Sequence, residues 1–362
     1  MCIRDSPLTL LAAAVLATSA AAPSATGAGA PSAHSPVGQE RGPASSFEFG
    51  VIGDVPYGEA QVAQFPAMMD ELSAQNDLEF LAHVGDVKSG SSECSDEYFA
   101  FIHDEFTDLE VPLVFTPGDN DWTDCHRQKA GQYDPLERLA ALREMFFADP
   151  DHTLGEPMRV DSQDEIGLPE NARFRTQRVE FGTINVQGSQ NSTAPWEGRG
   201  QTEPTEEQLA EVAHRDEANA TLLREMFDDA RRTNARGVVI FTQADMFLPD
   251  HVVDGVVDAP EDVAAFQQTV QTIAEQSRRF DGEVYLINGD SHEYNADEPL
   301  AAGSPWVEAY GVEPVENLRR VTVEGDADSN EWTRFSVAPM NAGKGRHADQ
   351  DLLSWERVPY KG

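Results

Sequence analysis

Four acidic side chains follow directly on short apolar runs, and a glycine precedes each of them. The four pairs are Gly53-Asp54, Gly85-Asp86, Gly118-Asp119 and Gly289-Asp290. A short apolar run is typical of a parallel strand that is buried on both faces, and α/β proteins bind ligands at the carboxyl ends of such strands. We therefore expect four carboxylates to meet at one edge of a sheet.

Carboxylates that converge in one crevice repel each other unless a positive charge lies between them. A single Gly-Asp pair is more often a turn or a helix cap than a ligand. Four such pairs in one chain, the last followed by Ser291 and His292, favour a site for one or two divalent cations.

The segments between these acids have the spacing of elements that would position them. Apolar residues recur at helical intervals in residues 59–75 and 97–109, which separate the first three strands. Further helices are predicted for residues 136–147 and 260–280, each opened by a proline, and for 205–234 with a break near 214–219. Alternating or apolar strands are predicted for residues 174–186, 237–242, 318–323 and 332–337, and the last two are expected to be antiparallel and to complete a second sheet. The fold class is therefore α/β, with two packed sheets flanked by helices.

The N-terminal region predicts export. Residues 7–22 form an apolar stretch with the length of a signal-peptide core, and it ends in small residues. Residues 23–46 are rich in Ala, Ser, Gly and Pro, which is typical of a flexible linker. We expect a signal peptide at 1–22, a linker at 23–46 and one domain at 47–362, in a secreted or periplasmic protein without a membrane span.

Two cysteines remain once Cys2 has left with the predicted leader. Cys94 and Cys125 each follow a Gly-Asp strand end by a few residues, so both belong to loops at the same edge of the sheet. In an oxidising compartment this placement favours a disulfide between them, and two free thiols are the alternative. A zinc site is disfavoured because no Cys-x-x-Cys pair is present.

The charge of the chain excludes some partners. It carries 26 basic and 64 acidic residues, a net charge of −38. Such a charge opposes contact with nucleic acid or anionic lipid, so we expect no nucleic-acid partner. A serine hydrolase is disfavoured as well, because the chain has no Gly-x-Ser-x-Gly motif.

The order Gly-Asp, Gly-Asp, Gly-[Asn/Asp]-x-[Asp/Glu] and a late Gly-x-x-His resembles the calcineurin-like metallophosphoesterase superfamily, which includes the purple acid phosphatases. The run PGDNDWTDCHR at residues 117–127 resembles an exported bacterial branch of that superfamily. The resemblance implies a four-layer αββα sandwich with two mixed sheets. It also implies a two-metal site at which a metal-bound hydroxide hydrolyses phosphate mono- or diesters.

The resemblance implies a set of metal ligands. Asp54 and His292 match ligands of the first metal, and Asp86 matches the ligand that bridges both metals. Asp119 and Asp290 match ligands of the second metal, and Gln243 matches a metal-binding histidine, although each of the three replaces the residue usual in the family. Pro56 stands where the family often has a histidine ligand, and the adjacent Tyr57 is an alternative ligand, a packing residue or a residue that hydrogen-bonds the substrate. So many oxygen donors favour Mn²⁺, Mg²⁺ or Ca²⁺, with iron and zinc as alternatives.

The catalytic histidine of the family falls on Asn120. Protonation of the leaving group would then need another donor, for which His83, His126 or a water are candidates. Lys88 and Arg127 are candidates to hold the oxygens of a small phosphate-ester substrate. Asn191, at the end of the run Gly188-Ser189-Gln190-Asn191, is a candidate for a substrate hydrogen bond or for stabilising a turn.

Two functions follow from these observations. The first is an exported, metal-dependent phosphoesterase. The second is a catalytically degenerate protein of the same fold that binds a metal or another ligand at a surface. The retained acids favour the first function, and the missing histidines favour the second.

Overall fold

The computed structural model describes residues 46–341 and 350–361. Residues 42–362 form one compact unit. The predicted signal peptide and residues 23–45 of the predicted linker lie outside the described residues. Within the described ranges, no helix has both the length and the apolar character needed to cross a membrane.

The first sheet has six strands and is mixed. Its centre is built from the parallel strands β1 (Phe47–Ile52), β2 (Leu78–His83) and β3 (Pro112–Phe115). Antiparallel strands extend it on both sides: β14 (Glu331–Val337) and β15 (Leu353–Pro359) beyond β1, and β4 (Leu154–Gly155) beyond β3. The strand β15 was not expected from the sequence.

The second sheet has seven strands and is also mixed. Four parallel strands form its centre: β7 (Val179–Thr183), β8 (Gly237–Phe241), β11 (Glu283–Asn288) and β13 (Leu318–Thr322). Antiparallel strands complete it: β5 (Asp161–Gln163), β6 (Leu168–Thr176) and β12 (Asn295–Asp297). A separate small hairpin pairs β9 (Val252–Val253) with β10 (Val256–Val257).

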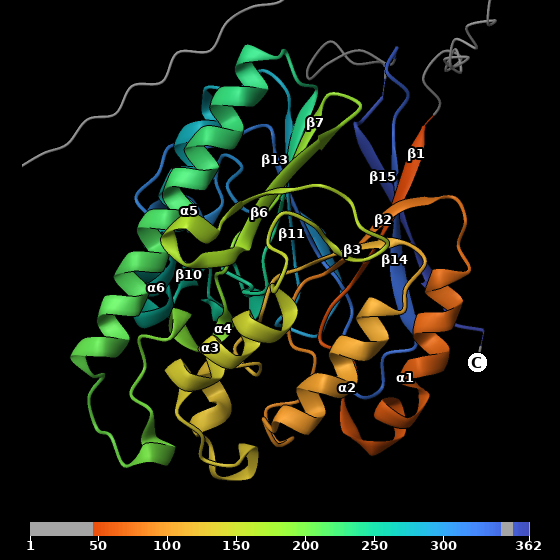
Figure 1. Cartoon of the computed structure of the whole chain (residues 1–362). Coiled ribbons are helices and arrows are strands. Elements are labelled where there is room, and N and C mark those ends of the chain that lie inside the picture. The colour runs from red at the N-terminus through yellow and green to blue at the C-terminus, as the bar shows by residue number, and fades with distance from the viewer. Residues whose placement is uncertain (1–45, 342–349, 362) are drawn as a thin grey trace, which may run out of the picture. The chain divides into compact units, whose positions relative to one another are not determined.

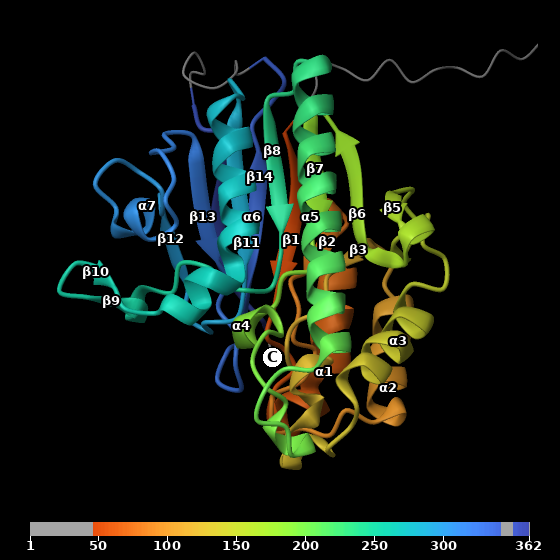
Figure 2. The same cartoon turned by 90° about the vertical axis from the view of Figure 1, so that its left-hand side faces the viewer.

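Helices cover the outer face of each sheet. The first sheet packs against α1 (Gly58–Ser73), α2 (Asp96–Thr107) and α3 (Pro135–Phe146). The second packs against α5 (Glu206–Arg232), α6 (Pro260–Arg278) and α7 (Pro305–Ala309). Figure 1 shows α5 on one side of the two sheets and α1 and α2 on the other, and Figure 2 shows α5 and α6 side by side.

A third apolar core lies between the two sheets. Phe49 of β1 stacks between Phe80 and Phe335 of its own sheet, with ring centroids 4.9 Å away in both directions. Its edge meets Phe181 of the second sheet at 5.6 Å. The layers are therefore helix, sheet, sheet and helix, which confirms the expected α/β class with an αββα sandwich of two mixed sheets.

Three expectations about individual elements need correction. Residues 318–323 and 332–337 were expected to be antiparallel strands that complete a second sheet, but β13 is parallel to β11 and β14 belongs to the first sheet, beside β1. The predicted break near residues 214–219 is wrong, because α5 is continuous from Glu206 to Arg232. The polar side chains of Arg215 and Asn219 are buried and donate hydrogen bonds to the carbonyl of Asn185, so they pack inside the protein without interrupting the helix. Residues 174–186 form parts of two strands, β6 and β7, joined at Gln177 and Arg178, whose positive φ values of 45° and 64° suit a tight hairpin turn.

Candidate metal centre

The four acids predicted to converge lie at the carboxyl ends of strands from both sheets. Asp54, Asp86 and Asp119 come shortly after β1, β2 and β3, and Asp290 comes shortly after β11. The parallel pairs Ile52↔His83 and Ile287↔Phe241 set the residues after these strands side by side. The backbone N–H of Asp290 donates to Asp54 Oδ2 at 3.0 Å, which joins the two sheets at this edge.

The amide of Gln243, just after β8, lies at the centre of the acids. Its Nε2 donates to Asp86 Oδ2 at 3.3 Å, to Asp119 Oδ1 at 3.2 Å and to Asp290 Oδ1 at 3.1 Å. Its Oε1 accepts the backbone N–H of Gly188 at 2.5 Å. The oxygen is thus turned away from the acids, and coordination of a metal by Gln243 stays a prediction that requires the amide to turn.

The residues before the acids are glycines for a steric reason, because a side chain at these positions would collide with its neighbours. A Cβ at Gly118 would lie 2.1 Å from Asp86 Oδ1, and a Cβ at Gly289 would lie 2.2 Å from Asp54 Oδ2. Each glycine therefore lets the backbone of one strand end pass directly over the carboxylate of another. At the other two pairs a Cβ would meet different neighbours, Val84 at 2.5 Å from Gly53 and Gln243 at 2.7 Å from Gly85, so crowding at the strand ends favours glycine before each acid.

Three of the acids, Asp54, Asp86 and Asp290, have a raised pKa. Burial is the main cause for Asp54 and Asp86, and neighbouring carboxylates add to it: Asp290 for Asp54, and Asp119 for Asp86. Burial, followed by the charge of Asp119, raises the pKa of Asp290 to about 8. Within the described residues, the one ion pair that joins these acids to a basic side chain is His292 Nε2 to Asp54 Oδ1, at 3.5 Å. The cluster is therefore short of positive charge.

Tyr57 and Asn120 border Asp86. The Tyr57 hydroxyl donates to Asp86 Oδ2 at 2.9 Å, and Asn120 Nδ2 lies 2.7 Å from the same oxygen and 2.9 Å from the Tyr57 hydroxyl. Burial, and then the charge of Asp86, raises the pKa of Tyr57 well above its usual value. The phenol therefore keeps its proton here and acts as a hydrogen-bond donor. The ring of His292, which is 38% exposed, meets the Tyr57 ring edge-on at 5.4 Å.

His83 and Lys88 lie behind the acids, away from solvent. His83 Nε2 contacts the carbonyl of Val55 at 3.0 Å, and its Nδ1 accepts the N–H of Gly85 at 3.2 Å. Burial lowers the pKa of His83 to about 4, so it is neutral and both ring nitrogens are engaged. Lys88 is fully buried and donates to the carbonyl of Asn120 at 2.8 Å. Both residues hold the loops that carry the acids.

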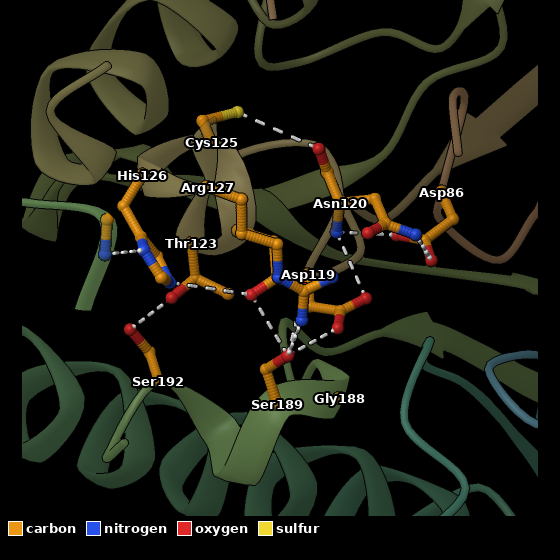
Figure 3. Close-up of polar contacts among 12 residues, drawn as sticks. Asp86, Asp119, Asn120, Thr123, Cys125, His126, Arg127, Gly188, Ser189 and Ser192 are labelled. Carbon is orange, nitrogen blue, oxygen red and sulfur yellow. Dashed lines mark hydrogen bonds and ion pairs between the residues drawn. The ribbon is translucent and has the colours of Figure 1, made fainter. Parts of the chain in front are cut away.

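Arg127 lies at the rim and is half-exposed. Its Nη2 pairs with Asp124 Oδ2 at 2.5 Å. Ser189 Oγ donates to Asp119 Oδ2 at 2.7 Å and lies 2.9 and 3.0 Å from the two oxygens of Asp124 (Figure 3). Asp124 and Ser189 were missed in the sequence. The one sequence signal for Asp124 was its place in the run at residues 117–127. In the structure its backbone N–H donates to the carbonyl of Asp119 at 2.9 Å.

Two predicted residues lie further from the acids. His126 is half-buried, and its Nδ1 accepts the N–H of Gly198 at 3.1 Å. Asn191 is buried and faces α5, where its Nδ2 donates to Asp216 Oδ1 at 2.9 Å. The structure therefore gives Asn191 the turn-stabilising position that was its alternative assignment.

The predicted disulfide is confirmed. Cys94 and Cys125 are bonded, with their Cα atoms 5.8 Å apart, and both are fully buried. The bond joins the loop after β2 to the short 3-10 helix η1 (Thr123–His126) after β3. It thereby ties together the segments that carry Asp86 and Asp119.

The acids do not surround a common point in this structure. Across residues 46–341 and 350–361, no three His, Cys, Asp or Glu side chains have the arrangement of a metal-ligand group. They gather around the neutral amide of Gln243, which has only two hydrogens for three carboxylate oxygens. The set therefore has more acceptors than donors.

No family model matches this chain, and no curated protein matches it. Among solved structures it is similar to one titled "GAP50 the anchor in the inner membrane complex of Plasmodium". The two share 9% sequence identity with a TM-score of 0.45, over 88% of this chain and 90% of that chain.

Proposed function

We propose that this protein is a metal-dependent phosphoesterase that hydrolyses small phosphate mono- or diesters. The observation that carries the proposal is that four carboxylates, from strand ends of both sheets, lie together at one edge, three of them around the amide of Gln243, and that among the described residues His292 is the one basic side chain that pairs with them. Proteins neutralise such a set either with protons or with cations. The resemblance of the strand-end motifs to calcineurin-like metallophosphoesterases favours cations.

The donors fit hard divalent cations. The donors present are four carboxylates, the amide of Gln243, whose oxygen would have to turn toward them, and the imidazole of His292. Asp54 and His292 would hold one cation and Asp119 and Asp290 a second, with Asp86 between them. Oxygen ligands favour Mn²⁺, Mg²⁺ or Ca²⁺. When bound, such cations supply a water of lowered pKa and neutralise charge on the phosphoryl group.

Binding of the phosphate group and protonation of the leaving group depend on side chains of this chain. Arg127 is 46% exposed at the rim, where its guanidinium can bind a phosphate oxygen. His292 is the ring beside the acids that stays partly exposed. His83 is buried, and Asn120 is engaged with Tyr57 and Asp86, so neither is placed to protonate a leaving group. We therefore expect a preference for esters whose leaving group departs without a proton.

One observation favours the second function, a binding module without hydrolysis. Gln243 turns its nitrogen toward the acids, and this arrangement satisfies part of the site without any cation. In that case the protein would bind a ligand at the same edge of the sheets and not turn it over.

Export remains part of the proposal. The apolar stretch at residues 7–22 and the pairing of Cys94 with Cys125 both suit an oxidising compartment outside the cytoplasm.

The test compares metal content and hydrolysis in the same preparations. Protein purified without chelator is analysed by elemental mass spectrometry and assayed with Mn²⁺ on p-nitrophenyl phosphate and its bis ester. Asp86→Asn should lose bound metal and activity, whereas Asp281→Asn, at an exposed acid, should change neither. Bound metal without turnover of either ester would favour the binding module. Absence of metal under every loading condition would refute the phosphoesterase.

A further inference from the structure

The segment that carries Ser189 has an unusual backbone. Ser189, Gln190, Asn191 and Ser192 have φ values of 47°, 55°, 52° and 65°, so four successive residues other than glycine are left-handed. This conformation is unfavourable for residues other than glycine and persists only where the surroundings enforce it. We call residues 188–192 the left-handed turn.

Arg215 of α5 holds the left-handed turn from inside the protein. Its side chain is fully buried. Its Nη2 donates to the carbonyl of Asn191 at 3.0 Å, its Nη1 donates to Asn191 Oδ1, and the same Nη1 donates to the carbonyl of Asn185 at 3.1 Å. Glu211, one helical turn earlier, pairs with Arg215 Nε at 2.9 Å. A planar guanidinium can donate to several acceptors at once in a fixed geometry, and a lysine ammonium cannot reproduce this arrangement of donors.

The left-handed turn makes two hydrogen bonds to residues of the candidate metal centre. Ser189 Oγ donates to Asp119 Oδ2, and the N–H of Gly188 donates to Gln243 Oε1 (Figure 3 shows the serine contacts). A Cβ at Gly188 would lie 2.4 Å from Asp290 Oδ1, so the turn lies directly against a second acid. Within the described residues, the hydrogen bonds of Arg215 go to Glu211, Asn185 and Asn191, and none reaches these acids.

We propose that Arg215 is a positioning residue of the metal centre: by holding the left-handed turn, it sets the orientation of Asp119 through Ser189 and of Gln243 through Gly188. The presence of a cation at this site rests on the proposed function. Residues that orient metal ligands without touching the metal typically change metal affinity by about 10- to 100-fold when they are replaced. We expect a loss of that size on removal of Arg215.

The experiment measures Mn²⁺ affinity by calorimetry, with no substrate present. Arg215→Met and Arg215→Lys should both weaken binding, by about 10- to 100-fold, whereas Arg224→Met, at a half-exposed position of the same helix, should leave it unchanged. Adding Gln190→Gly to Arg215→Lys should restore at least about fivefold, because glycine adopts the left-handed conformation without cost. A role confined to overall stability would lower the free energy of unfolding of the Arg215 variants and leave the Mn²⁺ affinity of the folded protein unchanged.

A second series keeps the inference testable if the Arg215 variants do not fold. Gln190 is only partly buried, and its replacement leaves Arg215 in place. Gln190→Val should weaken Mn²⁺ binding by about fivefold, since a β-branched residue resists the left-handed conformation, and Gln190→Gly should bind at least as well as wild type. Folded variants of both series that bind like wild type would overturn the role of Arg215. A wild type that binds no Mn²⁺ would overturn the proposed function instead.

Discussion

Replacing Asp290 by asparagine should stabilise the metal-free protein at alkaline pH. Asp290 is a carboxyl whose pKa is raised to about 8 in the folded protein, by burial and then by the charge of Asp119. Its usual value is 3.8. Between these two values the folded state holds a proton that the unfolded state has released. The free energy of unfolding is therefore highest at low pH and falls as pH rises toward 8.

The size of this gain in the free energy of unfolding follows from the raised pKa of Asp290. One carboxyl with this displacement would lose about 4 kcal/mol of stability between pH 5 and pH 8, at about 1.4 kcal/mol for each pH step. Asp290 raises the pKa of Asp54, so part of the shift belongs to the pair of carboxyls and not to Asp290 alone, and we expect about half of this value. The variant should thus gain about 2 kcal/mol relative to wild type over that pH range. Asparagine resembles the protonated carboxyl in shape, so the difference at pH 5 should be small.

The assay is urea unfolding followed by tryptophan fluorescence, with a chelator, at pH 5, 6, 7 and 8. The quantity of interest is the unfolding free energy of Asp290→Asn minus that of wild type, which removes the pH dependence common to both proteins. Asp281→Asn is the matched control at an exposed acid. Added Mn²⁺ should raise the stability of wild type at pH 8 and not that of Asp290→Asn. A difference that stays constant with pH, or falls as pH rises, would refute the electrostatic account.

Two further predictions concern the supports of the site. Replacing both Cys94 and Cys125 by alanine should lower the free energy of unfolding by about 3–4 kcal/mol, because the bond closes a loop across a sequence separation of 31; a loss below about 1 kcal/mol in urea unfolding would contradict this. Lys88→Met should lower it by about 3–5 kcal/mol, because a buried ammonium that offsets nearby acids is lost, and Lys129→Met at an exposed lysine is the control. Equal melting of the two lysine variants would show that the buried charge does not contribute.

The sequence predicts the parts of this fold that are coded locally. Apolar runs ending in Gly-Asp identified four of the strands around the site, because a buried parallel strand needs that pattern and the close approach at Gly118 requires the glycine. The strand β15 was missed because its alternation is weak and most of its side chains are at least partly exposed.

The parts of the site that were missed depend on distant contacts. Ser189 reaches Asp119 only because a left-handed turn is held by Arg215, 26 positions later in the chain, and no local pattern encodes that support. Lys88 lies among small polar residues, which suggests a solvated loop, yet the fold buries it behind the acids. Burial of a single polar side chain is decided by packing between elements, and composition does not reveal it.

The joining of two sheets at one edge has a consequence for when the site is completed. Asp54, Asp86 and Asp119 belong to the first third of the chain, whereas Gln243, Asp290 and His292 come from its last 120 residues. During synthesis the early acids are therefore present long before their partners. The proposed cation would be captured with full affinity only after the C-terminal strands have docked, so the choice of metal would fall to the compartment in which the last strands fold.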